Sequence, residues 1–121
     1  MIEAFFIALS PSYLMYMTIG ILLGLIVGTL PGLTATMGTA LLVPFTFALP
    51  TGEGIAMLGG LYVCAMFSDA IPACLVNTPG TPAAMATGFD GHPMVKQGRG
   101  QEAIVAACFS SALGTMFGAA C

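Results

Sequence analysis

Apolar residues run along most of this chain, and only short polar stretches separate them. No Asp, Glu, Lys or Arg occurs between Glu3 and Glu53, and none follows Glu102. A helix crosses the hydrocarbon core of a bilayer with about 20 apolar residues, so these runs are long enough to do so. The pattern predicts an all-α polytopic membrane protein with at least three full or partial crossings.

Residues 13–49 are a continuous uncharged stretch that is too long for one membrane crossing. As one helix of 37 residues it would extend about 55 Å, nearly two bilayer cores. The sequence GTLPGLTAT supplies an interruption, because Pro31 removes a backbone donor and Gly32 favours a turn. Thr34 is placed to cap a new helix. We therefore predict a break near 28–34.

A second apolar segment begins near Gly54 and is interrupted in the same way. It runs into NTPGTP at 77–82, where Thr81 and Pro82 form a typical N-cap and first-turn pair for another helix. The sequence thus predicts transmembrane helices that are discontinuous or re-entrant at two Pro-Gly breaks. The two dipeptides lie 48 residues apart, which is a weak indication of a repeat-built transporter.

Residues 88–102 are more polar than the rest and hold both cations of the chain, Lys96 and Arg99. Their glycines, proline and charges predict a polar loop, which the positive-inside tendency places in the cytoplasm. His92 has no companion ligands for a metal, so we assign it no chemistry. The apolar residues 103–121 then predict a third helix.

Composition excludes several functions. The chain is 58% hydrophobic and 6% charged, with a net charge of −3, so it offers no basic surface for nucleic acid and no polybasic membrane-binding patch. Its four cysteines show no CxxC spacing and are expected to act as small hydrophobic residues. The GxSxG, HExxH and P-loop patterns do not occur, so we expect no enzyme.

The two breaks are the candidate binding elements. Backbone outside a helix is tolerated at membrane depth only inside protein or beside a wet cavity. The helices that follow would direct free N–H groups toward an anion there, and unwound carbonyls could hold a small cation. The predicted substrate-binding residues are Pro31, Gly32, Thr34, Thr36, Asn77, Thr78, Pro79, Gly80 and Thr81. The alternative is that the breaks only bend helices for packing.

Asp69 is the one acid inside an apolar segment. An ionisable side chain in such a place is a candidate functional group, here for binding a coupling proton or cation. In a second interpretation it lies near an interface and caps a helix that begins at Ala70, with Pro72 in the first turn. The sequence leaves both roles open.

Glycine recurs every four residues in the first half of the chain and again near its end. Rows of this kind let neighbouring helices approach closely, and we expect them to serve packing within one protein rather than a dimer face. The residues are Gly20, Gly24, Gly28 and Gly32, and then Gly114 and Gly118.

Two long motifs, GLIVGTLPGLTATMGTALLVPFTF and LVNTPGTPAAMATGFDGHPMVKQGRG, resemble the large membrane subunit of tripartite tricarboxylate transporters, the TctA family. Members of that family are several times longer, so the resemblance implies that residues 1–121 are the amino-terminal part of a single membrane transport domain. It also implies a permease for tricarboxylates or related organic carboxylates in the bacterial cytoplasmic (inner) membrane. Such a symporter would use a Na⁺ or H⁺ gradient as its coupling cation and no other cofactor.

The implied partners are a small membrane subunit and a periplasmic solute-binding protein. The resemblance places both Pro-Gly stretches in the translocation core. The family commonly has two glycines where this chain has Ser68 and Asp69, a difference that bears on helix packing and on substrate or ion choice. Two alternatives stay open, a non-transporting assembly protein packed through Gly-xxx-Gly helices and a channel.

Overall fold

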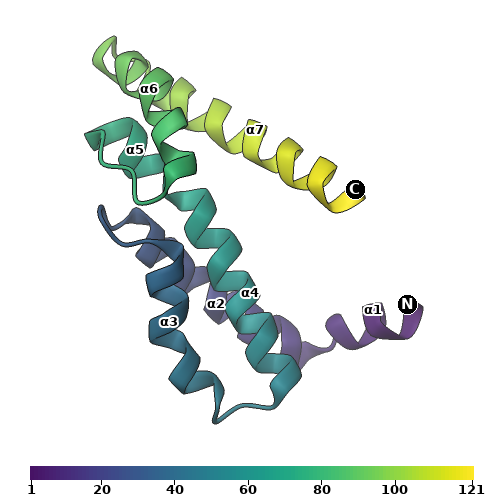
Figure 1. Ribbon diagram of the computed structural model, residues 1–121. Coiled ribbons are helices and arrows are strands. Elements are labelled where there is room, and N and C mark those ends of the chain that lie inside the picture. The colour runs from purple at the N-terminus through teal and green to yellow at the C-terminus, as the bar shows by residue number, and fades with distance from the viewer.

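The computed structural model describes residues 1–121, and its regular structure is entirely helical (Figure 1). Its elements are α1 (Ile2–Ala8), α2 (Pro11–Thr29), α3 (Ala35–Thr46), α4 (Thr51–Ser68), α5 (Ala70–Val76), α6 (Pro82–Lys96) and α7 (Gly100–Ala120). Three stretches are long and apolar enough to cross a membrane, namely Pro11–Thr29, Thr51–Val76 and Gly100–Ala120. The predicted all-α class with interrupted helices is confirmed.

Helices α2 and α4 lie side by side and run parallel, and α3 runs back between their ends (Figure 1). The glycine row of α2 forms this contact. Gly20, Gly24 and Gly28 face Met57, Leu61 and Ala65 of α4 in that order, and a Cβ at any of them would overlap a carbonyl oxygen of α4. Packing within one chain, which the sequence predicted for the row, is confirmed here. Gly32 lies beyond the end of α2.

The small core follows this close approach. Leu61 and Ala65 are 1% exposed, and Ala73 and Cys74 are fully buried. Ser68 extends the contact, since its hydroxyl donates to the Cys64 carbonyl at 2.9 Å and lies against Gly28 of α2. The best-packed part of the molecule is therefore the end of α4 and the start of α5.

Helices α5 and α6 form a tight hairpin above this core (Figure 1). Gly91 of α6 lies on the Cys74 sulfur, and Gly88 approaches the Ala73 carbonyl. His92 is half-buried, and its Nδ1 lies 3.1 Å from the Cys74 carbonyl oxygen. His92 thus links two helices and is not a loop residue.

The prediction of a polar loop over 88–102 is wrong. Helix α6 continues to Lys96 with Pro93 inside it, and α7 begins at Gly100, so only residues 97–99 form a turn. Glycines and a proline suggested a loop from local propensity. Packing of α6 on α5 overrides that propensity, because two of those glycines, Gly88 and Gly91, are where the helices touch.

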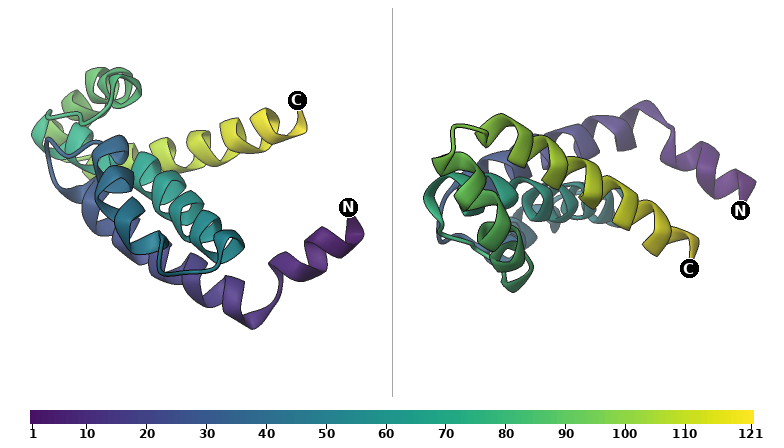
Figure 2. Two further views of the ribbon diagram at one scale, coloured as in Figure 1. Left: turned by 60° about the horizontal axis from the view of Figure 1, so that its bottom comes forward. Right: turned by 90° about the horizontal axis from the view of Figure 1, so that it is seen from above.

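Helix α1 and the last turns of α7 extend away from the rest of the molecule (Figure 2). Large apolar side chains on both are exposed, among them Phe5, Phe109 and Phe117. The only buried residue of α7 is Ala103 near its start. These helices present apolar surface outward, as lipid-facing or subunit-facing helices do.

Candidate functional site

The first predicted break lies where α2 ends. Leu30 adopts an extended conformation, and Gly32 has φ +91°, a left-handed conformation that favours glycine. Thr34 caps α3, since its hydroxyl oxygen accepts a hydrogen bond from the Met37 amide at 3.2 Å. Pro31 and Gly32 are exposed in the turn. Both the break and its cap are confirmed.

The second break, between α5 and α6, is also confirmed. Asn77 ends α5 in the left-handed conformation with φ 56°, and the Thr78 amide donates to the Pro72 carbonyl at 3.5 Å. Thr81 caps α6 by accepting from the Ala84 amide at 3.3 Å.

The two breaks differ in backbone detail. The left-handed residue is Gly32 in the first and Asn77 in the second, and Gly80 has no positive φ. The capping residues, Thr34 and Thr81, are also one position out of step with the Pro-Gly alignment. The repeat therefore stays a prediction.

The breaks nevertheless meet in space. A Cβ placed on Gly80 would lie 2.8 Å from the Leu33 carbonyl oxygen, so the backbones of the two breaks are in contact. Only glycine allows this approach without moving one chain. The two predicted breaks thus come together at one end of α2 and α4.

Asp69 lies behind this contact, at the bend between α4 and α5, and is 3% exposed. Its Oδ1 accepts from the Gly80 amide at 2.9 Å, and its Oδ2 accepts from the Thr81 hydroxyl at 2.7 Å. It makes no side-chain cap to α5, so the capping interpretation is wrong. The carboxylate instead lies at the amino-terminal end of α6, where the partial positive charge favours an anion.

This arrangement changes the expectation for the second break. The helix end predicted to face a substrate anion already has a resident carboxylate as its ligand. The one ion pair of the molecule joins exposed Arg99 to Glu102 across the start of α7, so Asp69 has no cationic partner within the chain.

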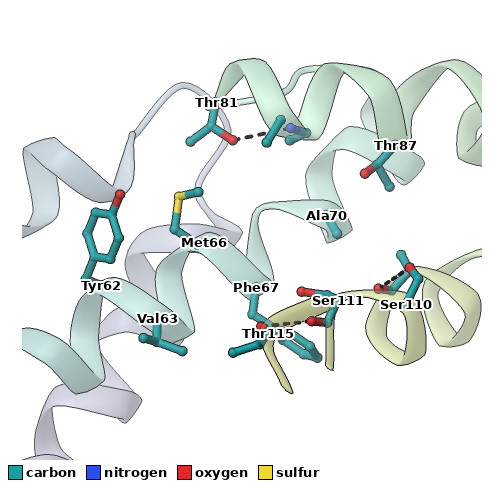
Figure 3. Close-up of a pocket in the computed structure, with 13 residues that line it drawn as sticks. Tyr62, Val63, Met66, Phe67, Ala70, Thr81, Thr87, Ser110, Ser111 and Thr115 are labelled. Atoms are coloured by element: carbon teal, nitrogen blue, oxygen red, sulfur yellow. Dashed lines mark hydrogen bonds between the residues drawn. The ribbon is translucent and has the colours of Figure 1, made fainter. Parts of the chain in front are cut away.

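A pocket of about 450 Å³ opens beside this break, between α4, α6 and α7 (Figure 3). Its hydroxyl-bearing residues come from all three helices and are Tyr62, Thr81, Thr87, Ser110, Ser111 and Thr115. Apolar side chains such as Val63, Met66 and Phe67 form the remaining wall. A mostly apolar hollow of this size with a few converging polar groups is typical of small-molecule sites.

The pocket's hydroxyls differ in how their protons are used. Thr81 donates to Asp69. Ser110 donates to the Ala107 carbonyl at 3.0 Å, and Thr115 donates to the Ser111 carbonyl at 2.8 Å (Figure 3). The hydroxyls of Tyr62, Thr87 and Ser111 have no such partner and are free to donate to a ligand. No Lys, Arg or His lines the pocket.

Of the nine predicted substrate-binding residues, only Thr81 lines this pocket. Thr34 and Thr36 lie at the start of α3, and Asn77 and Thr78 are exposed on the far side of the break. The hydroxyls of α7 were not among the predicted site residues. Their signal was present, since Ser110, Ser111 and Thr115 interrupt an otherwise apolar helix.

A second hollow, a groove of about 550 Å³ on α2 and α4, has a different character. Met17, Ile21, Val63 and Phe67 line it together with Gly59 and Gly60, and no side chain there bears a charge or hydroxyl. A carboxylate would find nothing to bind in this groove. No cluster of acidic, histidine and cysteine side chains suitable for a metal ion occurs in the chain.

Comparison with known proteins adds an independent finding. Residues 14–121 match the model of the "Tripartite tricarboxylate transporter TctA family". An uncharacterised 52.8 kDa protein from the TAR-I ttuC′ 3′ region of Agrobacterium vitis is 37% identical over 104 residues, and an uncharacterised protein of Methanocaldococcus jannaschii is 34% identical over 107 residues. Each alignment covers 86% of this chain but only 21% and 26% of the relatives, so the chain spans about a quarter of their length or less. No solved structure matches it.

Proposed function

This chain belongs to the tripartite tricarboxylate transporter TctA family, and on that basis we propose that it is part of the permease subunit of a secondary transporter for tricarboxylates or related organic carboxylates. Family membership and three candidate spans make it a membrane-embedded transport protein. The uptake would depend on a solute-binding protein and on a gradient of Na⁺ or H⁺. We place it in the bacterial cytoplasmic membrane with a small membrane subunit and a periplasmic binding protein as partners.

The observation that carries the proposal is the pocket beside the second break. Transporters commonly bind substrate where interrupted helices expose backbone and hydroxyl groups between helices. Here six hydroxyl-bearing residues of α4, α6 and α7 line one hollow of about 450 Å³. That volume lies within the usual range of small-ligand sites, about 300–1,000 Å³.

The free hydroxyls give this part of the site its chemistry. A carboxylate accepts hydrogen bonds, and Tyr62, Thr87 and Ser111 have protons available to donate. Because no cation lines the pocket, binding here rests on hydroxyl donors, with any cationic contact supplied from outside these residues.

The assembly alternative loses its main support from the sequence. The glycine row of α2 is occupied by α4 of the same chain. Gly114 and Gly118 of α7 face open space, and a row of small residues alone does not define a partner. Transport is therefore the function that the residues support best.

The test is uptake of radiolabelled citrate, as a tricarboxylate probe, by membrane vesicles that contain the complete transporter and its binding protein. We expect the pair Thr87→Val and Ser111→Ala to raise the KM about tenfold or more, since a hydrogen bond to a charged group contributes about 1.5–3 kcal/mol. Thr18→Val is the matched control, because that hydroxyl donates to the Leu14 carbonyl on α2, outside the pocket.

Uptake that equals background for the wild-type system with every di- and tricarboxylate offered would refute a carboxylate permease. Uptake that is normal in the pocket variants would instead move the substrate site elsewhere. A flux that rises without saturation as substrate increases would favour a channel.

A further inference from the structure

We propose that Asp69 is the proton-binding site of this carrier and that its protonation reverses the Thr81 hydroxyl, turning it from an acceptor into a donor for a substrate carboxylate. The inference rests on the proposed function. It identifies the coupling ion as a proton and Asp69 as the residue that binds it. It assigns Thr81, the one residue shared by the break and the pocket, a role that depends on its acidic neighbour.

When Asp69 is ionised, its carboxylate accepts two hydrogen bonds. The Gly80 amide donates to Oδ1 at 2.9 Å, and the Thr81 hydroxyl donates to Oδ2 at 2.7 Å. The Thr81 oxygen meanwhile accepts from the Ala84 amide at 3.3 Å. The only hydroxyl proton of Thr81 thus points away from the pocket, and what Thr81 offers a ligand is a lone pair. A carboxylate cannot bind to it.

A single proton changes this arrangement without moving a heavy atom. Protonated on Oδ2, Asp69 has an O–H that donates to the Thr81 oxygen, so the 2.7 Å bond keeps its length and reverses its direction. The Gly80 amide still donates to Oδ1. The Thr81 hydrogen then turns about the Cβ–Oγ bond into the pocket. One O–H bond has formed, and the side-chain charge has changed from −1 to 0.

Both effects favour an incoming carboxylate. It gains a hydroxyl donor in Thr81, and it no longer meets the negative charge of Asp69 one residue behind the pocket wall. That charge is 3% exposed and has no cationic partner, so water and counter-ions screen it little. Proton binding and carboxylate binding therefore support each other, as symport of the two requires.

Other groups do not substitute for Asp69. The hydrogen-bond partners of its carboxylate are Gly80 and Thr81, with the Leu33 carbonyl beside Gly80, and none of these residues is charged. Titratable side chains elsewhere on the packed helices are Tyr13 and Tyr16 of α2, Glu53, Tyr62 and Cys64 of α4, Cys74 of α5, Asp90, His92 and Lys96 of α6, and Glu102 and Cys108 of α7. None makes a hydrogen bond or ion pair with Asp69.

The geometry suits a proton better than a metal cation. A sodium ion needs several oxygen ligands, but here an N–H and an O–H already point at the carboxylate and would have to be displaced. A proton fits between two oxygens 2.7 Å apart with no rearrangement.

The test is citrate binding to the complete transporter, measured by substrate counterflow in proteoliposomes without sodium. As the pH is lowered from neutral, the wild-type affinity for the citrate trianion should rise about tenfold or more, the contribution of one hydrogen bond to a charged group. Asp69→Asn reproduces the neutral state, because its amide donates to Thr81 and its carbonyl accepts from Gly80. We expect it to retain counterflow, to lose the pH dependence, and to lose proton-driven accumulation.

A second pair of variants covers a failure of Asp69→Asn to fold. Thr81→Ser keeps the hydroxyl and should keep the pH dependence, whereas Thr81→Val should bind weakly and keep only the smaller pH dependence that comes from the charge of Asp69. Thr34→Val is the matched control, since it removes the corresponding cap at the first break, which has no acidic partner, and should leave the pH dependence intact.

The outcomes separate the two proposals. Absence of wild-type transport at any pH would refute the transporter function itself. Transport whose pH dependence survives in Asp69→Asn, or is undiminished in Thr81→Val, would overturn the inference alone. A wild-type affinity that follows sodium and ignores pH would also overturn it.

Discussion

Replacing Gly28 by alanine should force the two parallel helices apart. A Cβ there would lie 2.5 Å from the Ala65 carbonyl oxygen and would also overlap the Ser68 hydroxyl. Ordinary van der Waals contact begins at 3.4 Å, so α2 would have to retreat by about 0.9 Å. The obstacle is helix backbone, which cannot turn aside as a long side chain can.

The expected magnitude follows from two opposing terms. Overpacking of a tight contact costs about 1–3 kcal/mol, and a gap approaching 1 Å between the helices weakens the neighbouring contacts as well. Against this, alanine has a better helix propensity than glycine by about 1 kcal/mol. Gly59→Ala on α4 measures the gain in helix propensity alone, because a Cβ at Gly59 meets nothing within 4 Å.

The assay is unfolding of the complete protein in mixed micelles by added dodecyl sulfate, followed by circular dichroism. Gly28→Ala should unfold at a lower denaturant fraction than wild type, and Gly59→Ala at an equal or higher one. Adding Ser68→Ala should recover part of the loss, since it removes one of the two overlaps and the pair is coupled. Equal stability of Gly28→Ala and Gly59→Ala would refute the close backbone contact.

Three further predictions concern the breaks and the α5–α6 hairpin, each measured by the same unfolding assay. Gly32→Ala should destabilise by about 1–2 kcal/mol through its positive φ alone, and Gly32→Asn should cost less; equal costs would exclude a left-handed residue. His92→Leu should cost about 1 kcal/mol, because the Cys74 carbonyl loses its partner; an unchanged midpoint would contradict that bond. Gly80→Ala should destabilise more than Gly32→Ala, because its Cβ would press on the Leu33 carbonyl, and the reverse order would mean that the two breaks do not touch.

The interruptions themselves were predictable because their causes are local. The Pro31-Gly32 pair disfavours continuation of a helix, and threonines placed as Thr34 and Thr81 cap the next one. The same local reasoning failed for residues 88–102. Contacts with α5 keep this segment helical although it contains glycine and proline. The local sequence alone does not show that such a packing partner exists.

The site was predictable only in part for the same reason. Both breaks were identified, and their meeting at Leu33 and Gly80 was expected from the pairing of such segments. The pocket depends on how α7 returns past α4, which fixes Ser111 opposite Thr87. Asp69 was identified as a candidate, but its partners lie 11 and 12 residues further along the chain and could not be read from spacing.

The contact between α2 and α4 has a mechanical consequence. Where glycine brings main chain against main chain, no layer of adjustable side chains remains to absorb sliding or tilting. We expect those two helices to move together as one rigid unit. In the proposed transporter, rocking would then concentrate at the joints that flank this helix pair, the bend at Asp69 and the turn at Gly32, and we expect that immobilising either joint arrests uptake.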